Sequence, residues 1–305
     1  MKLLLPLMLA ISVFYSQMAH ANYTKTKYPI VLVHGIFGFD DIVGIDYFYG
    51  IPQALTSDGA QVFVASVSAA NSSELRGEQL LAQVEYILAL TGAEKVNVFG
   101  HSQGAQTVRY VASVKPELVA SVTSIGGANW GSKVADIVRN TVPEGSFTEA
   151  FAETLANSFA AIISFFSGQG MHPQDALAAL EVLTTSGTLS FNQKYPEGLP
   201  SHYCGEGEML ASNGVMYFSW SGSKGLTNIL DPLDGAIGLL SLAFNEPSDG
   251  LVSSCSSHLG LVIKDNYKMN HLDEINHSFG LHHLFETDPV TVYRRHANRL
   301  KNLGL

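Results

Sequence analysis

The sequence predicts an α/β fold in which a mostly parallel sheet is covered by helices on both faces. Short apolar runs alternate along the chain with longer segments of helical periodicity, the pattern of repeated strand–helix–strand units. Mostly apolar runs of this kind are expected for strands that are buried on both faces. No internal repeat, low-complexity tract or linker-like change in composition divides the chain, so we expect a single domain over residues 22–305.

The expected elements follow one another in this alternating order. Strands are predicted at 30–33, 62–67, 96–99 and 119–125, and helices at 71–90 and 105–114. The first of these helices has an apolar face with a period of 3.6 residues, made by Leu80, Leu81, Val84, Ile87 and Leu88. From about 127 to 200 the pattern turns helical. Strand character returns at 215–220, and a last helix is expected from 289 to 300.

The composition excludes several classes of protein. The chain is 46% hydrophobic and only 14% charged, against roughly 25% charged in ordinary soluble domains, which argues against disorder and coiled coils. The chain has 17 Lys and Arg residues and 27 Asp and Glu residues, which gives a net charge of −10. Nucleic acid and anionic membranes both require a basic surface, so neither is an expected partner.

The first 21 residues have the features of a secretory signal peptide. Met1-Lys2 begins a short positive region, residues 3–14 are apolar apart from Ser12, and Ala19-His20-Ala21 supplies a cleavage site. The apolar run is too short for a comfortable membrane span. A buried N-terminal helix is the alternative. We therefore expect an exported protein.

The chain has two cysteines, Cys204 and Cys255. In an exported protein they can pair in only one way, and the pair would close a loop of about 50 residues. Two free, buried thiols are the alternative. Two cysteines this far apart indicate no metal site.

The motif Gly100-His101-Ser102-Gln103-Gly104 has the form Gly-x-Ser-x-Gly. It lies directly between the strand at 96–99 and the helix at 105–114. A serine at such a sharp turn adopts strained backbone angles, and the small flanking residues let the turn close. The exposed hydroxyl then lies beside a helix N-terminus, which favours negative charge on a reacting carbonyl. Ser102 is therefore the predicted nucleophile, and a glycine-rich loop with an incidental serine is the alternative.

A serine nucleophile needs a histidine base and an orienting carboxylate, normally in the chain order serine, acid, histidine. His271 is the favoured base because it lies in a polar, loop-like stretch before the last helices. Spacing alone does not select it from the eight histidines that follow the motif, at positions 172, 202, 258, 271, 277, 282, 283 and 296. Asp249 is the favoured acid because it lies at a turn, although Asp231 and Asp234 also precede His271.

The loop after the first predicted strand contributes a further candidate feature. Val33-His34-Gly35-Ile36 ends that strand near the expected position of Ser102. Backbone N–H groups of this loop could form an oxyanion hole together with the N–H of Gln103. A simple strand-ending turn is the alternative.

Taken together, these residues resemble the Pseudomonas-type true lipases, the bacterial family I triacylglycerol lipases. The resemblance covers essentially the whole chain after residue 21. Its motifs are Tyr28–Gly35, Arg76–Gln79, Gly100–Gly104, Cys204–Gly207, Ser219–Gly222, Asp249–Val252 and Met269–Asp273. It implies an α/β-hydrolase fold and a triad of Ser102, Asp249 and His271. It also implies a Cys204–Cys255 disulfide and an oxyanion hole formed by the backbone N–H groups of Ile36 and Gln103.

The same resemblance implies one structural Ca²⁺ ion. The family's carboxylate ligands correspond to Asp231 and Asp273, and its two backbone carbonyl ligands to His277 and Leu281. Similar relatives commonly carry glutamine at the position of His277, but a backbone ligand survives that change. A hard cation prefers such an oxygen set. Without the resemblance, the two aspartates would be taken for surface carboxylates.

An apolar stripe in the helical region falls on the family's lid helix. It consists of Phe147, Phe151, Leu155, Phe159, Ile162, Ile163 and Phe166, at steps of three and four residues. We therefore expect a helical lid within about 127–200, which covers the site in water and lies on lipid when open. An ordinary helix packed on the core is the alternative.

The resulting expectation is a secreted serine lipase, exported through the periplasm, that hydrolyses triacylglycerols at lipid–water interfaces through an acyl-enzyme. The resemblance also implies possible assistance by a lipase-specific foldase. Two other functions remain open: a carboxylesterase for short soluble esters, and a non-catalytic lipid-binding protein on a hydrolase scaffold.

Overall fold

A computed structural model describes residues 22–36, 41–42, 45–139, 149–166 and 174–305. The expected signal peptide and Phe147 lie outside these residues, as do the side chains of Ile163 and Phe166. Within the described part, none of the helices combines the length and the apolar character needed to cross a bilayer.

A six-stranded, fully parallel sheet forms the centre of the molecule, as the alternating pattern predicts. Its strand order is β4-β1-β5-β6-β7-β8. The strands are β1 (Ile30–Val33), β4 (Val62–Ala65), β5 (Val96–His101), β6 (Val119–Ile125), β7 (Met216–Gly222) and β8 (Leu261–Tyr267). A separate antiparallel pair consists of β2 (Asp41–Ile42) and β3 (Ile45–Asp46). Because all six strands of the main sheet run the same way, the loops at their carboxyl ends meet at one edge.

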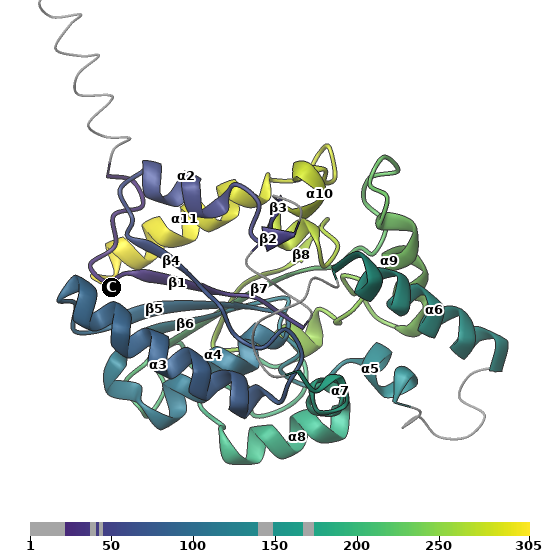
Figure 1. The fold of residues 1–305 in the computed structure, drawn as a ribbon, viewed down its shortest axis with the longest axis horizontal. Coiled ribbons are helices and arrows are strands. Elements are labelled where there is room, and N and C mark those ends of the chain that lie inside the picture. Colours follow the sequence, from purple (N-terminus) through teal and green to yellow (C-terminus); the bar gives the residue numbers. More distant parts are fainter. Residues whose placement is uncertain (1–21, 37–40, 43–44, 140–148, 167–173) are drawn as a thin grey trace, which may run out of the picture.

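Helices cover both faces of the sheet (Figure 1). The α-helices are α2 (Ile51–Ser57), α3 (Ser73–Thr91), α4 (Gln103–Val114), α5 (Lys133–Val138), α6 (Glu149–Phe166), α7 (Ala176–Leu183), α8 (Thr185–Lys194), α9 (Asp234–Leu240), α10 (His277–Gly280) and α11 (Pro289–Asn302). Single 3₁₀ turns lie at Pro116–Leu118, Ser241–Ala243, Cys255–Ser257 and Asp273–Ile275. Side chains cap the N-termini of α3 and α11. The Ser72 hydroxyl accepts a hydrogen bond from Leu75 N–H at 3.2 Å, and the Asp288 carboxylate accepts one from Thr291 N–H at 3.1 Å.

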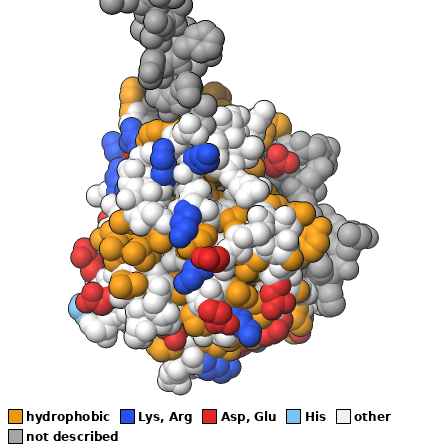
Figure 2. Space-filling model, turned by 90° about the vertical axis from the view of Figure 1, so that its left-hand side faces the viewer, with side chains coloured by type: hydrophobic (Ala, Val, Ile, Leu, Met, Phe, Trp, Pro, Cys, Tyr) orange, Lys and Arg blue, Asp and Glu red, His pale blue; other side chains and the backbone are white. Residues whose placement is uncertain are grey.

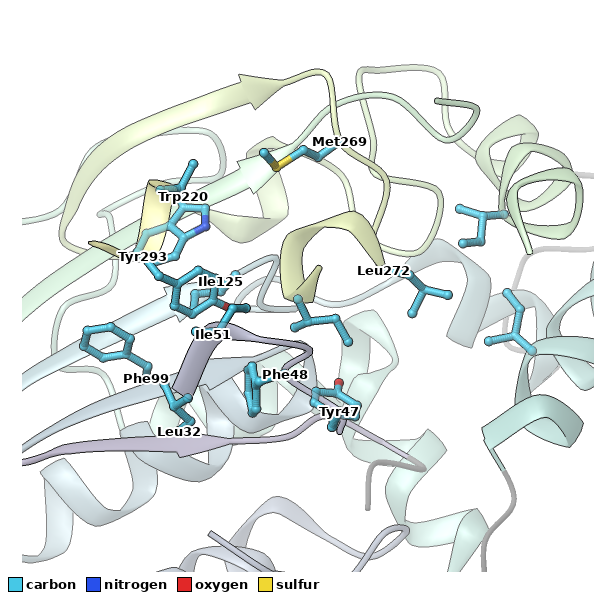
Figure 3. Packing of buried hydrophobic residues seen from close by; sticks show 14 of the residues in the cluster. Leu32, Tyr47, Phe48, Ile51, Phe99, Ile125, Trp220, Met269, Leu272 and Tyr293 are labelled. Atoms are coloured by element: carbon cyan, nitrogen blue, oxygen red, sulfur yellow. The ribbon is translucent and has the colours of Figure 1, made fainter. Parts of the chain in front are cut away.

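Alternation along β1 divides the core into two layers. Ile30 and Leu32 face α2 and α11, whereas Val31 and Val33 face α3 and α4. The first layer is rich in aromatic side chains, and Figure 3 shows Phe99, Trp220 and Tyr293 packed beside Ile125. Because β1 is buried on both faces, it is apolar throughout, and its sequence is a continuous apolar run.

Most of the expected elements are confirmed to within a few residues. On α3, Leu80, Val84 and Ile87 are buried as predicted. Strand β8 was not predicted, because it lies at the edge of the sheet, is only partly buried, and carries the polar run Lys264-Asp265-Asn266. A disulfide joins Cys204 and Cys255, so the predicted pairing is confirmed.

Candidate active site

Ser102 lies in the tight turn between β5 and α4. Its φ of 56° and ψ of −125° are rare for a non-glycine residue, so the backbone is strained at the predicted nucleophile. The motif glycines permit this turn: a Cβ on Gly100 would lie 2.2 Å from the Gly104 carbonyl oxygen, and one on Gly104 would lie 2.4 Å from the Val33 carbonyl oxygen. Ser102 is thereby held at the carboxyl edge of the sheet and at the N-terminus of α4.

The structure brings the predicted acid and base into contact. Asp249 Oδ2 lies 2.7 Å from His271 Nδ1, and both side chains are buried. Asp249 Oδ1 accepts hydrogen bonds from the backbone N–H groups of Leu251 and Val252, at 2.8 and 2.7 Å. These bonds fix the carboxylate, and the carboxylate favours the tautomer of His271 that carries its proton on Nδ1. Nε2 is then free to accept a proton.

A second buried carboxyl group, that of Glu274, lies next to this pair. Its Oε2 is 3.9 Å from His271 Nδ1 and 3.3 Å from His101 Nε2. Burial, followed by the charge of Asp249, raises the pKa of Glu274 well above its usual value. This shift favours the neutral form of Glu274, which does not compete with Asp249 as an anion. The Glu274 side chain also explains the glycine at position 126, where a Cβ would lie 1.9 Å from Glu274 Oε2.

His101 connects this cluster to the loop after β1. Its Nε2 lies 3.0 Å from the backbone carbonyl oxygen of His271, and its Nδ1 lies 2.7 Å from the Tyr47 hydroxyl, which in turn accepts from Gly35 N–H at 3.0 Å. Burial lowers the pKa of His101 well below its usual value, so the ring is neutral. Ligand atoms of His101, His271 and Glu274 lie within 4.8 Å of one another. We interpret this group as a hydrogen-bonding network because Asp249 already engages His271.

The buried guanidinium of Arg76, on α3, holds the predicted oxyanion loop. It donates to the carbonyl oxygens of His34 and Gly35 at 2.5 and 3.1 Å. It also donates to Gln103 Oε1 at 2.6 Å, so it ties the loop to the first residue of α4. Burial lowers the pKa of Arg76 to about 9, which leaves it charged at neutral pH. Ile36 and Ser102 line the same cavity.

A small apolar cavity adjoins Ser102. Its volume is about 30 Å³. Its walls include Ile36, Leu180, Leu183, Leu251, Val252 and, from α6, Phe159. Leu155, Phe159 and Ile162 of the predicted lid stripe are buried against the core. Phe159 of α6 therefore forms part of the wall of the space beside Ser102.

The two predicted carboxylate ligands for calcium are both buried. Asp231 Oδ2 and Asp273 Oδ1 accept no hydrogen bond from the described part of the chain. Burial raises the pKa of Asp231, and it raises that of Asp273 to about 7, with further contributions from Asp234 and Asp231. Buried carboxylate oxygens without hydrogen-bond donors, in groups that repel each other, fit a divalent cation. His277 and Leu281 lie on and just after α10, in the segment that follows Asp273.

Comparison with known proteins decides the family. Residues 28–220 match the family described by the alpha/beta hydrolase fold. A Vibrio cholerae protein named triacylglycerol lipase is 62% identical over 98% of both chains, and a Pseudomonas fragi triacylglycerol lipase is 48% identical over 92% of this chain and 98% of its own. The chain belongs to the bacterial triacylglycerol lipases. The fold agrees with lipase 1 from Pelosinus fermentans, at a TM-score of 0.60 and 18% identity, over 92% of this chain and all of that one.

Two residues of this lipase site received no role in the sequence analysis, although Arg76 stands in one of the motifs that carry the family resemblance. Arg76 stands four residues before Leu80, on the apolar face of α3, and a charged residue on a buried face is a signal that could have identified it. Glu274 carried no such signal, because an acid three residues after His271 looks like a surface residue. Only the structure shows that the Glu274 side chain is buried beside His271. Asp234, an alternative acid, instead accepts hydrogen bonds from Thr227 and Asn228.

Proposed function

We propose that the chain hydrolyses the ester bonds of triacylglycerols at a lipid–water surface, with Ser102, His271 and Asp249 as the catalytic triad. The observation that carries this proposal is the 2.7 Å contact between Asp249 and His271, at the same sheet edge as a strained serine turn. The substrate class is supported by relatives that match nearly all of both chains and are named triacylglycerol lipases.

In the proposed reaction, His271 Nε2 removes the proton of Ser102 Oγ while this oxygen attacks the ester carbonyl carbon. The bond to the alcohol oxygen breaks, the alcohol leaves with the proton from His271, and the acyl group stays on Ser102. Water, deprotonated by His271, then attacks the acyl carbon and releases the fatty acid, and Ser102 Oγ recovers its proton. Asp249 keeps Nδ1 protonated throughout and stabilises the imidazolium.

The oxyanion of each tetrahedral intermediate would be stabilised by the backbone N–H groups of Ile36 and Gln103. Loss of one such donor typically costs about 3 kcal/mol of transition-state stabilisation. Arg76 acts through these groups, because it fixes the carbonyls of His34 and Gly35 and the side chain of Gln103.

We propose that α6 is the lid of this site. Phe159 closes the cavity beside Ser102, and Leu155 and Ile162 on the same helix face are buried. Exposing these side chains to water is unfavourable, whereas a lipid surface accepts them. Opening is therefore coupled to contact with lipid. The expected signature is a rate that rises steeply once a short-chain ester exceeds its solubility limit.

The decisive experiment combines mutation with covalent labelling. Ser102→Ala should lower ester hydrolysis by at least about a thousandfold and abolish labelling by an organophosphonate, without changing the melting curve. Ser190→Ala, an exposed serine on α8, should retain both activity and label. Peptide mapping should place the label on the peptide containing Ser102. Near-normal turnover by a folded Ser102→Ala protein contradicts the assignment.

The same comparison tests the two alternative functions. A carboxylesterase for soluble esters would show saturation below the solubility limit and no further rise above it. A non-catalytic lipid-binding protein would take no organophosphonate label. The strained turn at Ser102 and the buried Asp249–His271 pair both favour a working hydrolase.

We propose one structural Ca²⁺ ion held by the carboxylates of Asp231 and Asp273 and the backbone carbonyls of His277 and Leu281. The buried carboxylate oxygens that lack hydrogen-bond donors support it. Bound calcium would neutralise these carboxylates and hold the loop that carries His271, two residues before Asp273. The protein's own backbone donors serve the oxyanion, so the ion is assigned no catalytic step.

We also propose that the chain is secreted through the periplasm, with possible help from a lipase-specific foldase. The leader-like residues 1–21 support export, and the resemblance to the family supports the foldase. Expression of the chain in a host without a foldase gene, followed by an activity assay of the culture medium, tests both the export and the need for a foldase.

A further inference from the structure

Two loops at one end of the molecule expose large apolar side chains. The exposed fractions are 57% for Leu226, 94% for Ile229, 75% for Leu230, 66% for Phe279, 83% for Leu284 and 88% for Phe285. Single exposed apolar residues are common on protein surfaces, whereas a cluster this exposed marks an interaction surface. Residues 226–230 and 279–285 are called the apolar loop pair below.

The two loops are held together by hydrogen bonds. Asn228 Nδ2 donates to the carbonyl oxygen of His282 at 3.1 Å, which links the first loop to the second. The Phe279 ring lies edge-on to Tyr49, with centroids 6.1 Å apart, so that side chain is held while most of it remains exposed. In Figure 1, the loop before α9 and the loop after α10 project from the same end of the molecule. The apolar loop pair is therefore one surface.

This surface carries no fixed charge. Neither range contains Asp, Glu, Lys or Arg, and its only titratable residues are His282 and His283. Figure 2 shows a different face, the left-hand side of Figure 1, where basic and acidic side chains are interspersed. A chain with a net charge of −10 is repelled by an anionic membrane, but it can contact an uncharged lipid surface.

The apolar loop pair is also close to the proposed lid. Helix α9 starts at Asp234, four residues after Leu230, and it packs against α6. Leu239 on α9 and Leu242 just after it are also exposed, which adds two apolar side chains to the exposed surface of this region. A surface bound by the loops would therefore lie beside the helix that closes the Ser102 cavity.

We propose that the apolar loop pair anchors the enzyme to uncharged lipid surfaces, such as a triacylglycerol droplet or a zwitterionic layer. The most exposed side chains, Ile229 and Phe285, insert among the acyl chains and hold the lid helix against the lipid. Lipid fits better than a protein partner because exposed, uncharged tips can enter lipid without a complementary groove. The inference rests on the proposed function, since it supplies the surface on which that reaction would occur.

The test measures binding without hydrolysis. All proteins carry Ser102→Ala, and flotation with phosphatidylcholine vesicles containing triolein gives the partition coefficient. The loop variant is Ile229→Asp/Phe285→Asp. Its matched control is Tyr86→Asp/Leu90→Asp, which adds the same charge at two exposed apolar residues of α3, 67% and 61% exposed. The loop variant should bind at least about a hundredfold more weakly, because a carboxylate is costly to place in hydrocarbon, and the control should stay within about twofold.

Further measurements distinguish apolar anchoring from electrostatic binding and from self-association. Binding of the parent protein should not change with salt and should not strengthen with phosphatidylglycerol vesicles. Equal binding by the loop variant and its control overturns the proposal, as does binding that requires anionic lipid. If the parent self-associates in sedimentation experiments and the loop variant does so less, with vesicle binding unchanged, a second copy covers this surface and the proposal is wrong.

Different measurements test the anchoring role of the apolar loop pair and the proposed function. With Ser102 intact, the loop variant should still hydrolyse a soluble ester and lose activity on emulsified triolein. Triolein hydrolysis equal to that of the control overturns the anchor alone. Absence of all ester hydrolysis in the parent overturns the proposed function, while the flotation result still stands. If the double Asp variant does not fold, Leu284→Ser/Phe285→Ser replaces it, with an expected loss of about tenfold.

Discussion

Removal of the proposed calcium ion should destabilise this lipase more at alkaline than at mildly acidic pH. In the metal-free protein, burial raises the pKa of the Asp273 carboxyl from 3.8 to about 7. The folded state therefore binds a proton between these two values that the unfolded state has released. The free energy of unfolding of the metal-free protein must then fall as the pH rises from about 4 to about 7. Calcium bound at the proposed site would remove this loss, because it would stabilise the ionised carboxylate.

The magnitude follows from the shift. About three pKa units at about 1.4 kcal/mol each give a loss of about 4 kcal/mol above pH 7, and about half of this by pH 5.5. For a chain of this size, 1 kcal/mol changes the melting temperature by about 2 °C. Chelation should therefore lower the melting temperature by about 4 °C more at about pH 8 than at about pH 5.5.

Circular-dichroism melting with and without a chelator, at both pH values, measures this difference. Elemental analysis must first show that the metal was removed. Asp231→Asn should abolish the effect of added calcium, whereas Glu117→Gln, at an exposed carboxylate, should preserve it. Superimposable curves for the metal-free and calcium-loaded protein would refute the calcium site. A calcium effect that is equal at both pH values would refute the assigned role of the Asp273 carboxyl.

Three further substitutions test other parts of the site. Arg76→Met should lower kcat on a soluble ester by about a hundredfold with little change in KM, because the carbonyl oxygens of His34 and Gly35 lose their buried donor. Arg76→Lys should recover part of this loss. A changed KM with an unchanged kcat would contradict the positioning role of Arg76. Phe159→Asp should reduce activity on emulsified long-chain ester far more than on a soluble short-chain ester, because it places a charge on the face of the proposed lid that would meet lipid. Equal losses on both substrates would indicate an ordinary packing helix. Gly126→Ala should lower the melting temperature by about 5 °C or more, because the added Cβ would lie 1.9 Å from the buried Glu274 carboxyl group. An unchanged melting curve would show that this carboxyl group can move.

Features set by local physics could be predicted from the sequence. The strands β1, β5 and β6 are buried along their whole length, which is why most of the residues in each predicted run are apolar. The nucleophile turn was predictable because it demands glycines at fixed offsets from Ser102. Strand β8 was missed because an edge strand is solvated on one side and keeps polar residues.

The composition of the active site depended on long-range contacts. Spacing did not select His271 from eight histidines, and the preference for Asp249 as its partner came from turn chemistry and from family resemblance. In the structure, the choice follows from the folding of two loops, which places the Asp249 carboxylate 2.7 Å from His271 Nδ1. The hydrophobic periodicity of the sequence does not predict such a contact, because the two loops come together only after the sheet has formed.

The sequence by itself determined the α/β architecture, the serine turn and the apolar stripe of α6, because periodicity and glycine placement act over a few residues. Only the tertiary structure decided that Arg76 lies buried under the oxyanion loop, that Glu274 lies beside the base, and that two loops far apart in the chain share one exposed apolar surface. The physical reason is that burial and solvent exposure belong to the packed molecule: the same arginine, glutamate or phenylalanine has a different free energy and pKa in contact with water than inside the protein.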